Sequence, residues 1–109
     1  MKYIITVILF VMTLDASATN ITGTINSLSV GRLGDQIFVD LDTNVPNICG
    51  TPHPNGFEYA FLISENDAAA EIVGALMLAY NSGKSVTIVG LNVCTIDTRV
   101  EDMSYVILR

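Results

Sequence analysis

The sequence predicts a small, mainly β protein with one helix, and three observations predict it. Apolar residues alternate with polar ones in five separate runs, which is typical of half-buried strands. One segment repeats its apolar residues at the helical period. The three prolines all fall between Asp42 and Gly56, a stretch that therefore predicts a loop. The order along the chain is strand, strand, strand, helix, strand, strand.

The first two runs predict a hairpin. Residues 21–30, "ITGTINSLSV", carry two isoleucines on one parity and then Leu28 and Val30 on the other. A change of parity within one strand indicates a bend or a bulge. Residues 31–35, "GRLGD", predict a turn, and residues 36–41, "QIFVDL", alternate as a second strand.

The third strand and the helix follow the proline-containing loop. Residues 57–63, "FEYAFLI", alternate, and their aromatic side chains indicate a core or an interface. Ser64 or Asn66 is placed to cap a helix that ends near Ser82, with Gly83 in the left-handed conformation just beyond it. Its predicted apolar face comprises Ala69, Ile72, Val73, Leu76, Met77 and Tyr80.

Residues 85–91, "SVTIVGL", and residues 103–109, "MSYVILR", predict the fourth and fifth strands. A helix between the third and fourth of five strands is the order of an OB-fold, a Greek-key barrel. The expected class is thus mainly β with one helix, an OB-fold-like five-stranded barrel of order β-β-β-α-β-β. A mixed α+β sandwich with the same chain order is the alternative.

Residues 1–18 have the three parts of a secretory signal peptide. Lys2 precedes an apolar run, and Ala16 and Ala18 form an A-x-A cleavage site. The run is shorter than the roughly 20 apolar residues that a membrane span needs. We therefore expect a secreted or periplasmic protein without a membrane span after cleavage, in which residues 19–109 form a single OB-fold-like domain.

Two cysteines, Cys49 and Cys94, lie in the mature part of the chain. In an oxidising compartment such a pair predicts a disulfide, which in the chain-entropy model constrains the unfolded chain by about 4 kcal/mol. A metal or redox pair is a weak alternative, since there is no C-x-x-C and His53 is the sole histidine. With prolines on both sides, His53 is expected to be a solvated loop residue. We expect no metal and no cofactor.

The charge of the chain excludes some partners. Removal of residues 1–18 leaves 4 basic and 10 acidic residues, a net charge of 4 − 10 = −6. Nucleic-acid binding depends on cationic contacts to phosphate, so we expect no nucleic acid. Docking on anionic lipid by charge alone is disfavoured as well. A neutral or sugar-like ligand is compatible with this charge.

The triplet Gly83, Lys84 and Ser85 has the last three letters of a P-loop, but its context is wrong for one. The first glycine of that motif is replaced by Leu78, and Gly83 is placed to end a helix. Phosphate is bound at the amino end of a helix, whereas the carboxyl end carries negative partial charge. We therefore expect no nucleotide site.

No catalytic constellation stands out, so the sequence favours a binding protein over an enzyme. Asp40 and Asp42 share one side of the second strand, and Glu101 and Asp102 precede the fifth. Such carboxylates are usually part of a solvated face, as we expect here. With one histidine and both cysteines paired, a nucleophile would lack a base.

Several short motifs resemble a known group of proteins. They are "TGTINSLSV", "IFVDL", the helix that runs into "SGKSVTI", and the late cysteine. Together they resemble short secreted bacterial OB-fold proteins such as the B subunit of subtilase cytotoxin, the pentameric glycan-binding part of a toxin. The resemblance implies a pentameric homo-oligomer with helices lining a central pore, a host glycan bound on the side of the barrel, and a catalytic toxin subunit as partner.

One site residue follows from this resemblance. Thr22 falls where the toxin subunit has a sugar-contacting serine at the start of its first strand. The first functional hypothesis is therefore a secreted, non-catalytic glycan-binding module that uses Thr22. The alternative is a periplasmic or secreted structural or protein-interaction domain without a small ligand, which would use residues 44–56 and the edge of the last strand.

Overall fold

The structure is a computed structural model that describes residues 20–109, so the predicted signal peptide of residues 1–18 lies outside the described residues. The described part is mainly β with one α-helix, as predicted. In chain order the elements are β1 (Asn20–Arg32), β2 (Gln36–Leu41), β3 (Tyr59–Leu62), a short 3-10 helix (Ile63–Glu65), α1 (Ala69–Ser82), β4 (Ser85–Gly90) and β5 (Glu101–Leu108).

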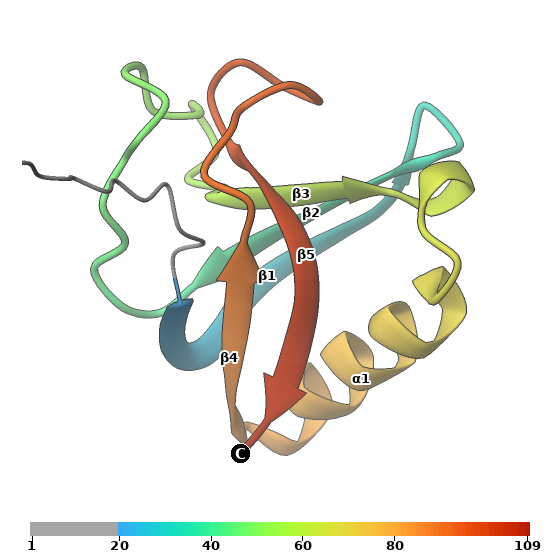
Figure 1. The fold of residues 1–109 in the computed structure, drawn as a ribbon. Helices are drawn as coiled ribbons and strands as arrows, with labels where there is room; N and C mark the ends of the chain where they lie inside the picture. The colour runs from blue at the N-terminus through green and yellow to red at the C-terminus, as the bar shows by residue number, and fades with distance from the viewer. Residues whose placement is uncertain (1–19) are drawn as a thin grey trace, which may run out of the picture.

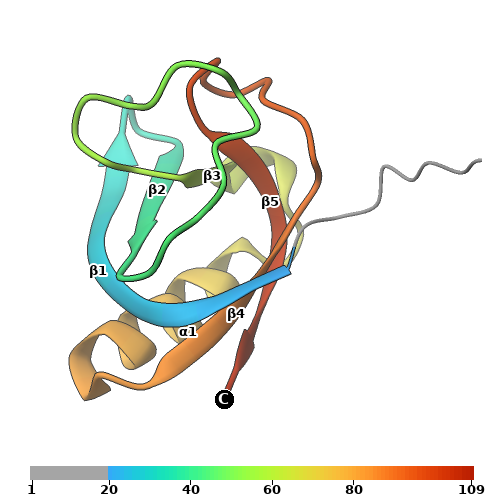
Figure 2. The same cartoon turned by 90° about the vertical axis from the view of Figure 1, so that its left-hand side faces the viewer.

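The five strands form one sheet in the order β1-β2-β3-β5-β4, in which the last two strands exchange places relative to the chain (Figure 1). The β3 and β5 strands run parallel, and the other neighbours are antiparallel. The first half of β1 pairs with β4 and its second half pairs with β2. The sheet therefore closes on itself, and β1 sweeps around it in Figure 2.

The bend predicted in the first strand is present. The register between β1 and β2 shifts between Ile25 and Ser27, so Asn26 is an extra residue. Because of this shift, Ile25 and Leu28 both pack in the interior although they lie on opposite parities. Gly23 lies at the same curve, where a Cβ atom would approach Thr43 Cγ2 to 3.0 Å.

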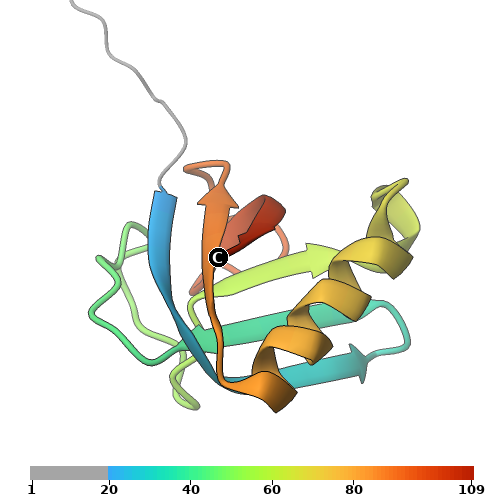
Figure 3. The ribbon, with the colours of Figure 1, turned by 90° about the horizontal axis from the view of Figure 1, so that it is seen from below.

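The α1 helix lies across one end of the closed sheet (Figure 3). It buries a narrow apolar stripe against the core, made of Ala69, Ile72, Leu76 and Ala79. The predicted face was wrong in part, since Met77 and Tyr80 are 43% and 49% exposed. The helix touches the sheet along a single line, so residues to either side of that line face outward.

Only the carboxyl end of α1 lies where the sequence predicted it. Gly83 adopts the predicted left-handed conformation, with φ of 70°, directly after the last helical residue. The start lies later than predicted, because residues 63–65 form a 3-10 turn. Ser64 bonds to Asp35 instead of capping α1, while Asn66 accepts a hydrogen bond from the Ala68 amide at 3.0 Å.

Two long loops cover the opposite end of the sheet (Figures 1 and 2). They are residues 42–58, between β2 and β3, and residues 91–100, between β4 and β5. The predicted disulfide joins them, with 5.9 Å between the Cα atoms of Cys49 and Cys94. Among residues 20–109, no helix is both long and apolar enough to cross a membrane.

Candidate functional site

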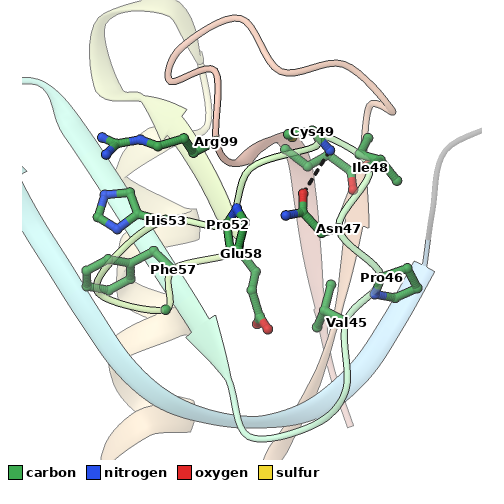
Figure 4. Close-up of a pocket in the computed structure, with 12 residues that line it drawn as sticks. Val45, Pro46, Asn47, Ile48, Cys49, Pro52, His53, Phe57, Glu58 and Arg99 are labelled. Carbon is green, nitrogen blue, oxygen red and sulfur yellow. Dashed lines mark hydrogen bonds between the residues drawn. The ribbon is translucent and has the colours of Figure 1, made fainter.

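The two disulfide-joined loops enclose a pocket of about 180 Å³, which we call the loop pocket (Figure 4). Its walls are mostly apolar and include Val45, Pro46, Ile48, Pro52 and Phe57. Polar side chains also reach it, among them His53, Glu58, Arg99 and Glu101. An apolar hollow with a few converging polar groups is the usual form of a small-ligand site.

Glu58 is the perturbed acid of the loop pocket. In Figure 4 its side chain extends between Val45 on one side and Phe57 on the other. Burial, with a smaller contribution from the charge of Asp40, raises the pKa of Glu58 to about 7, although the hydrogen bond from the Leu41 amide opposes this. Near neutral pH the carboxyl group is therefore able both to donate and to accept hydrogen bonds.

His53 is buried, which corrects the expectation of a solvated loop residue. Only 9% of it is exposed, and its ring packs edge-on against Phe38 and Phe57 with centroids 5.6 and 5.5 Å away. Its Nδ1 atom accepts a hydrogen bond from the Asn55 amide at 3.0 Å. Burial lowers the pKa of His53, and the charge of Arg99 lowers it further, so the ring is neutral near pH 7.

The reason for this burial is a second apolar cluster on the outer face of the sheet. Phe38 points outward from β2 and packs with Ala60 and Val100, and with Phe57 at its edge. The loop that carries His53 folds back over this cluster. Phe38 stands on the opposite parity to the core residues of β2, and that outward aromatic was the available sequence signal for a covered outer face.

Arg99 and Asp97 form a two-point ion pair in the second loop. The Arg99 Nε atom donates to Asp97 Oδ1 at 3.0 Å, and Nη2 donates to Oδ2 at 2.9 Å. These hydrogen bonds to Arg99 lower the pKa of Asp97 to about 2. The pair fixes the guanidinium at the edge of the loop pocket.

Glu101 and Asp102 are buried, with 3% and 7% exposure, which corrects the expectation of a solvated face. Glu101 accepts a hydrogen bond from the Asn92 amide at 2.9 Å. Asp102 accepts from the amides of Thr95 and Ile96, and from the Thr95 hydroxyl. The loop between β4 and β5 has no strand partner for these amides, so the two carboxylates supply the acceptors.

Asp40 is likewise a hydrogen-bond acceptor for neighbouring side chains. It is half-buried, and its Oδ2 atom accepts hydrogen bonds from Asn26 at 2.8 Å and Ser27 at 3.3 Å. Asp42, the other carboxylate of the predicted pair, is exposed. The carboxylates singled out in the sequence therefore do not converge on one cleft.

Thr22 lies on the outer face of β1, opposite Thr87 of β4. Its hydroxyl is 2.6 Å from the Thr87 hydroxyl, which also accepts a hydrogen bond from Arg109 Nε at 2.9 Å. We call this arrangement of Thr22, Thr87 and Arg109 the hydroxyl chain. Thr87 and Arg109 were missed from the sequence because only the strand register places them beside Thr22.

The described residues also bear on the other predicted sites. Thr22 does not line the loop pocket, so the hydroxyl chain is a separate surface. Gly83 ends α1 and Ser85 begins β4, so the Gly-Lys-Ser triplet lies at the carboxyl end of the helix. Within residues 20–109, no group of three His, Cys, Asp or Glu side chains is placed to hold a metal ion.

Comparisons with known proteins assign no family. Searches of protein-family models, curated proteins and solved structures returned no match to the chain. Two surfaces of the molecule are candidates for its functional site. These are the hydroxyl chain, whose residue Thr22 is exposed, and the loop end of the sheet, with Glu58, His53 and Arg99.

Proposed function

We propose that the protein is a secreted, non-catalytic binding module whose ligand is a glycan, contacted by Thr22. The observation that carries this proposal is the hydroxyl chain. Thr22 is exposed on a paired strand, and its hydroxyl is held by Thr87, which is in turn held by the Arg109 guanidinium. The hydroxyl of this exposed residue is thus fixed in position before any ligand arrives.

A fixed hydroxyl suits a sugar because sugars present adjacent hydroxyl groups that both donate and accept hydrogen bonds. The hydrogen bond with Thr87 uses either the proton or one lone pair of the Thr22 hydroxyl, so the remaining capacity is available to a ligand, and Arg109 adds N–H donors beside it. Binding costs less when the protein groups are already ordered. Strand pairing on both sides of Thr87 supports that order.

The arrangement of the strands supports an OB-fold-like barrel as the scaffold. The sheet order β1-β2-β3-β5-β4, its closure through β1, and a helix between β3 and β4 are all compatible with that fold. OB-folds include oligosaccharide binders. The fold alone names no function, so the hydroxyl chain remains the main argument.

The outward face of α1 supports a homo-oligomer. Met77, Leu78 and Tyr80 are 43%, 60% and 49% exposed, and Glu71 is the one charged residue in the helix. A second copy would cover these apolar side chains, as in a ring whose helices meet. The pentamer and a catalytic toxin subunit as its partner belong to the proposal through the resemblance described above.

The test is a glycan array with the purified, disulfide-bonded protein, followed by titration of the best glycan. Thr22→Val keeps the shape of the side chain and removes the hydroxyl, and we expect about 3- to 10-fold weaker binding. Thr22→Ser retains the hydroxyl group and should bind as the wild type does. A silent array, or equal binding by Thr22→Val, contradicts the proposal.

The alternative is a structural or protein-interaction domain without a small ligand. Exposed apolar side chains at the loop end favour it, since Ile48, Leu91 and Val93 are at least 38% exposed. These residues lie on the two loops that the disulfide joins. A silent array together with loss of partner binding in Ile48→Ser would support this alternative over the first.

A further inference from the structure

A second hollow, of about 380 Å³, lies beside the loop pocket on the outer face of the sheet. We call it the two-arginine hollow; its main lining residues are Ser29, Arg32, Phe38, His53, Phe57 and Arg99. Ser29 lies in the half of β1 that pairs with β2, whereas Thr22 lies in the half that pairs with β4. About seven residues of strand, roughly 20 Å, separate the two positions along β1.

The hollow concentrates positive charge on an acidic protein. Residues 20–109 hold four Lys and Arg residues against ten Asp and Glu residues, yet Arg32 and Arg99 both line this hollow. Within the described part of the chain, no carboxylate lines it. Asp97, the carboxylate that pairs with Arg99, is not among its lining residues. After that pair forms, three of the five guanidinium N–H groups of Arg99 remain to bind a ligand.

Aromatic rings form the apolar part of the hollow. Phe38, His53 and Phe57 contact one another edge-to-face, with centroids 5.5 to 5.7 Å apart. The Arg32 guanidinium carbon lies 5.9 Å from the centre of the Phe38 ring, which holds the charge over the rings. Because His53 Nδ1 accepts the Asn55 amide, the proton of the neutral ring is on Nε2.

We propose that the two-arginine hollow binds an acidic sugar, with its carboxylate or sulfate between Arg32 and Arg99. Arginine pairs with such oxyanions through two parallel hydrogen bonds. The apolar C–H face of the sugar ring would lie on the aromatic side chains. The proposal rests on the proposed function in taking a sugar as ligand, but it names a different site from Thr22. The volume of the two-arginine hollow is in the range of small-ligand sites.

The experiment is an NMR titration of the ¹⁵N-labelled, disulfide-bonded protein. The probes are glucuronic acid and glucose 6-sulfate, with glucose as their neutral parent and sodium sulfate as the free anion. We expect the acidic sugars to shift the amides of Ser29, Asn55 and Arg99 in a saturable manner. Glucose should not shift them, and sulfate should bind more weakly than the acidic sugars. Equal affinity for sulfate and acidic sugar, or shifts confined to other residues, overturns the proposal.

Arg32→Gln removes one charge from an exposed side chain, so the fold should tolerate it. We expect this variant to bind the acidic sugars about tenfold more weakly. Lys84→Gln is the matched control, since it removes the same charge from an exposed residue that does not line the hollow, and it should bind as the wild type does. Equal weakening by both variants would reveal a general charge effect and overturn the site.

The same titration separates this inference from the proposed function. If Arg32→Gln weakens binding and Thr22→Val does not, the result supports the two-arginine hollow as the binding site and contradicts the role of Thr22. If only Thr22→Val weakens binding, the hollow is overturned while glycan binding survives. If the wild type binds neutral glycans but no acidic sugar, the hollow is also overturned.

Discussion

The two ends of the closed sheet are covered by different kinds of structure, and different interactions stabilise them. One end is covered by α1, which packs an apolar stripe of Ala69, Ile72, Leu76 and Ala79 against the core. The other end is covered by residues 42–58 and 91–100, which rely on a disulfide, buried carboxylates and an ion pair. A helix satisfies its own amides and can bury a smooth apolar face, whereas loops need side-chain acceptors and covalent links.

This difference also bears on where the loop pocket and the two-arginine hollow lie. Irregular loops leave gaps between them, and both the loop pocket and the two-arginine hollow lie at the loop end. Polar groups brought in to hold the loops, such as Arg99, then line those gaps. The helix end presents instead the exposed apolar side chains Met77, Leu78 and Tyr80. The following predictions test this contrast, from the largest expected effect on stability to the smallest.

The loop end should depend on its covalent link. Replacement of Cys49 and Cys94 by serine removes a link between residues 45 apart in sequence and should lower the free energy of unfolding by about 4 kcal/mol. Urea denaturation of the variant and of the wild type, without reductant, measures the difference. A loss below about 1 kcal/mol would show that the loops are held by their polar contacts alone.

The helix end should depend on apolar packing. Leu76 is 1% exposed and Leu78 is 60% exposed in the same helix, so the pair is matched in helix propensity. We expect Leu76→Ala to lower the free energy of unfolding by about 3 kcal/mol and Leu78→Ala by less than about 0.5 kcal/mol. Urea denaturation checks both values, and similar losses would contradict the packing described for α1.

The loop pocket should make the stability of the protein depend on pH. The folded-state pKa of Glu58 is about 7, above its ordinary value of 4.5, so the folded state holds this proton more tightly than the unfolded state does. Its contribution to stability is complete below about pH 4.5 and is lost as the pH rises through about 7.

Glu58→Gln tests this pH dependence, because glutamine imitates the protonated carboxyl group and can still accept the Leu41 amide. We expect the stability of the variant relative to the wild type to increase between pH 4.5 and pH 8. Glu65→Gln, at an exposed position, is the control for removal of a charge. A relative stability that stays constant with pH would contradict the assignment of this titration to Glu58.

The smallest effect on stability should come from the exposed face of α1. Leu78→Asp places a charge on a 60% exposed side chain, so the monomer should stay folded. In the proposed oligomer the same charge would be buried between copies, and mass photometry should show dissociation to monomers. An oligomer that survives Leu78→Asp would exclude this face as the interface.

Periodicity and spacing predicted much of the framework. The alternation in residues 36–41 predicted the limits of β2, the parity change in residues 21–30 predicted the bulge, and Gly83 predicted the end of α1. The cysteine pair predicted the disulfide because an even pair in a chain that is expected to be exported has few other uses. These features depend on local conformation or on a simple count, so one sequence is enough.

The candidate sites were much less accessible from the sequence. His53 looked solvated because its prolines indicate a loop, and nothing local shows that this loop folds back over Phe38. Glu101 and Asp102 looked exposed because their partners are loop amides, which carry no pattern in a sequence. Thr22 was found through a resemblance, while Arg109 reaches its partner Thr87 only through the pairing of β4 with β5.

The extra residue Asn26 determines where the chain can accept an insertion or a deletion. Asn26 lies between Ile25 and Ser27, the first two residues of β1 that pair with β2, and just after the part of the strand that pairs with β4. Deletion of Asn26 alone would keep the reading frame. It would also shift the following residues of β1 by one position, so that Leu28 would turn from the interior to the surface. Insertions or deletions should therefore be accepted in the exposed part of the 42–58 loop and rejected throughout β1, which makes the loop the place for a tag or a reporter.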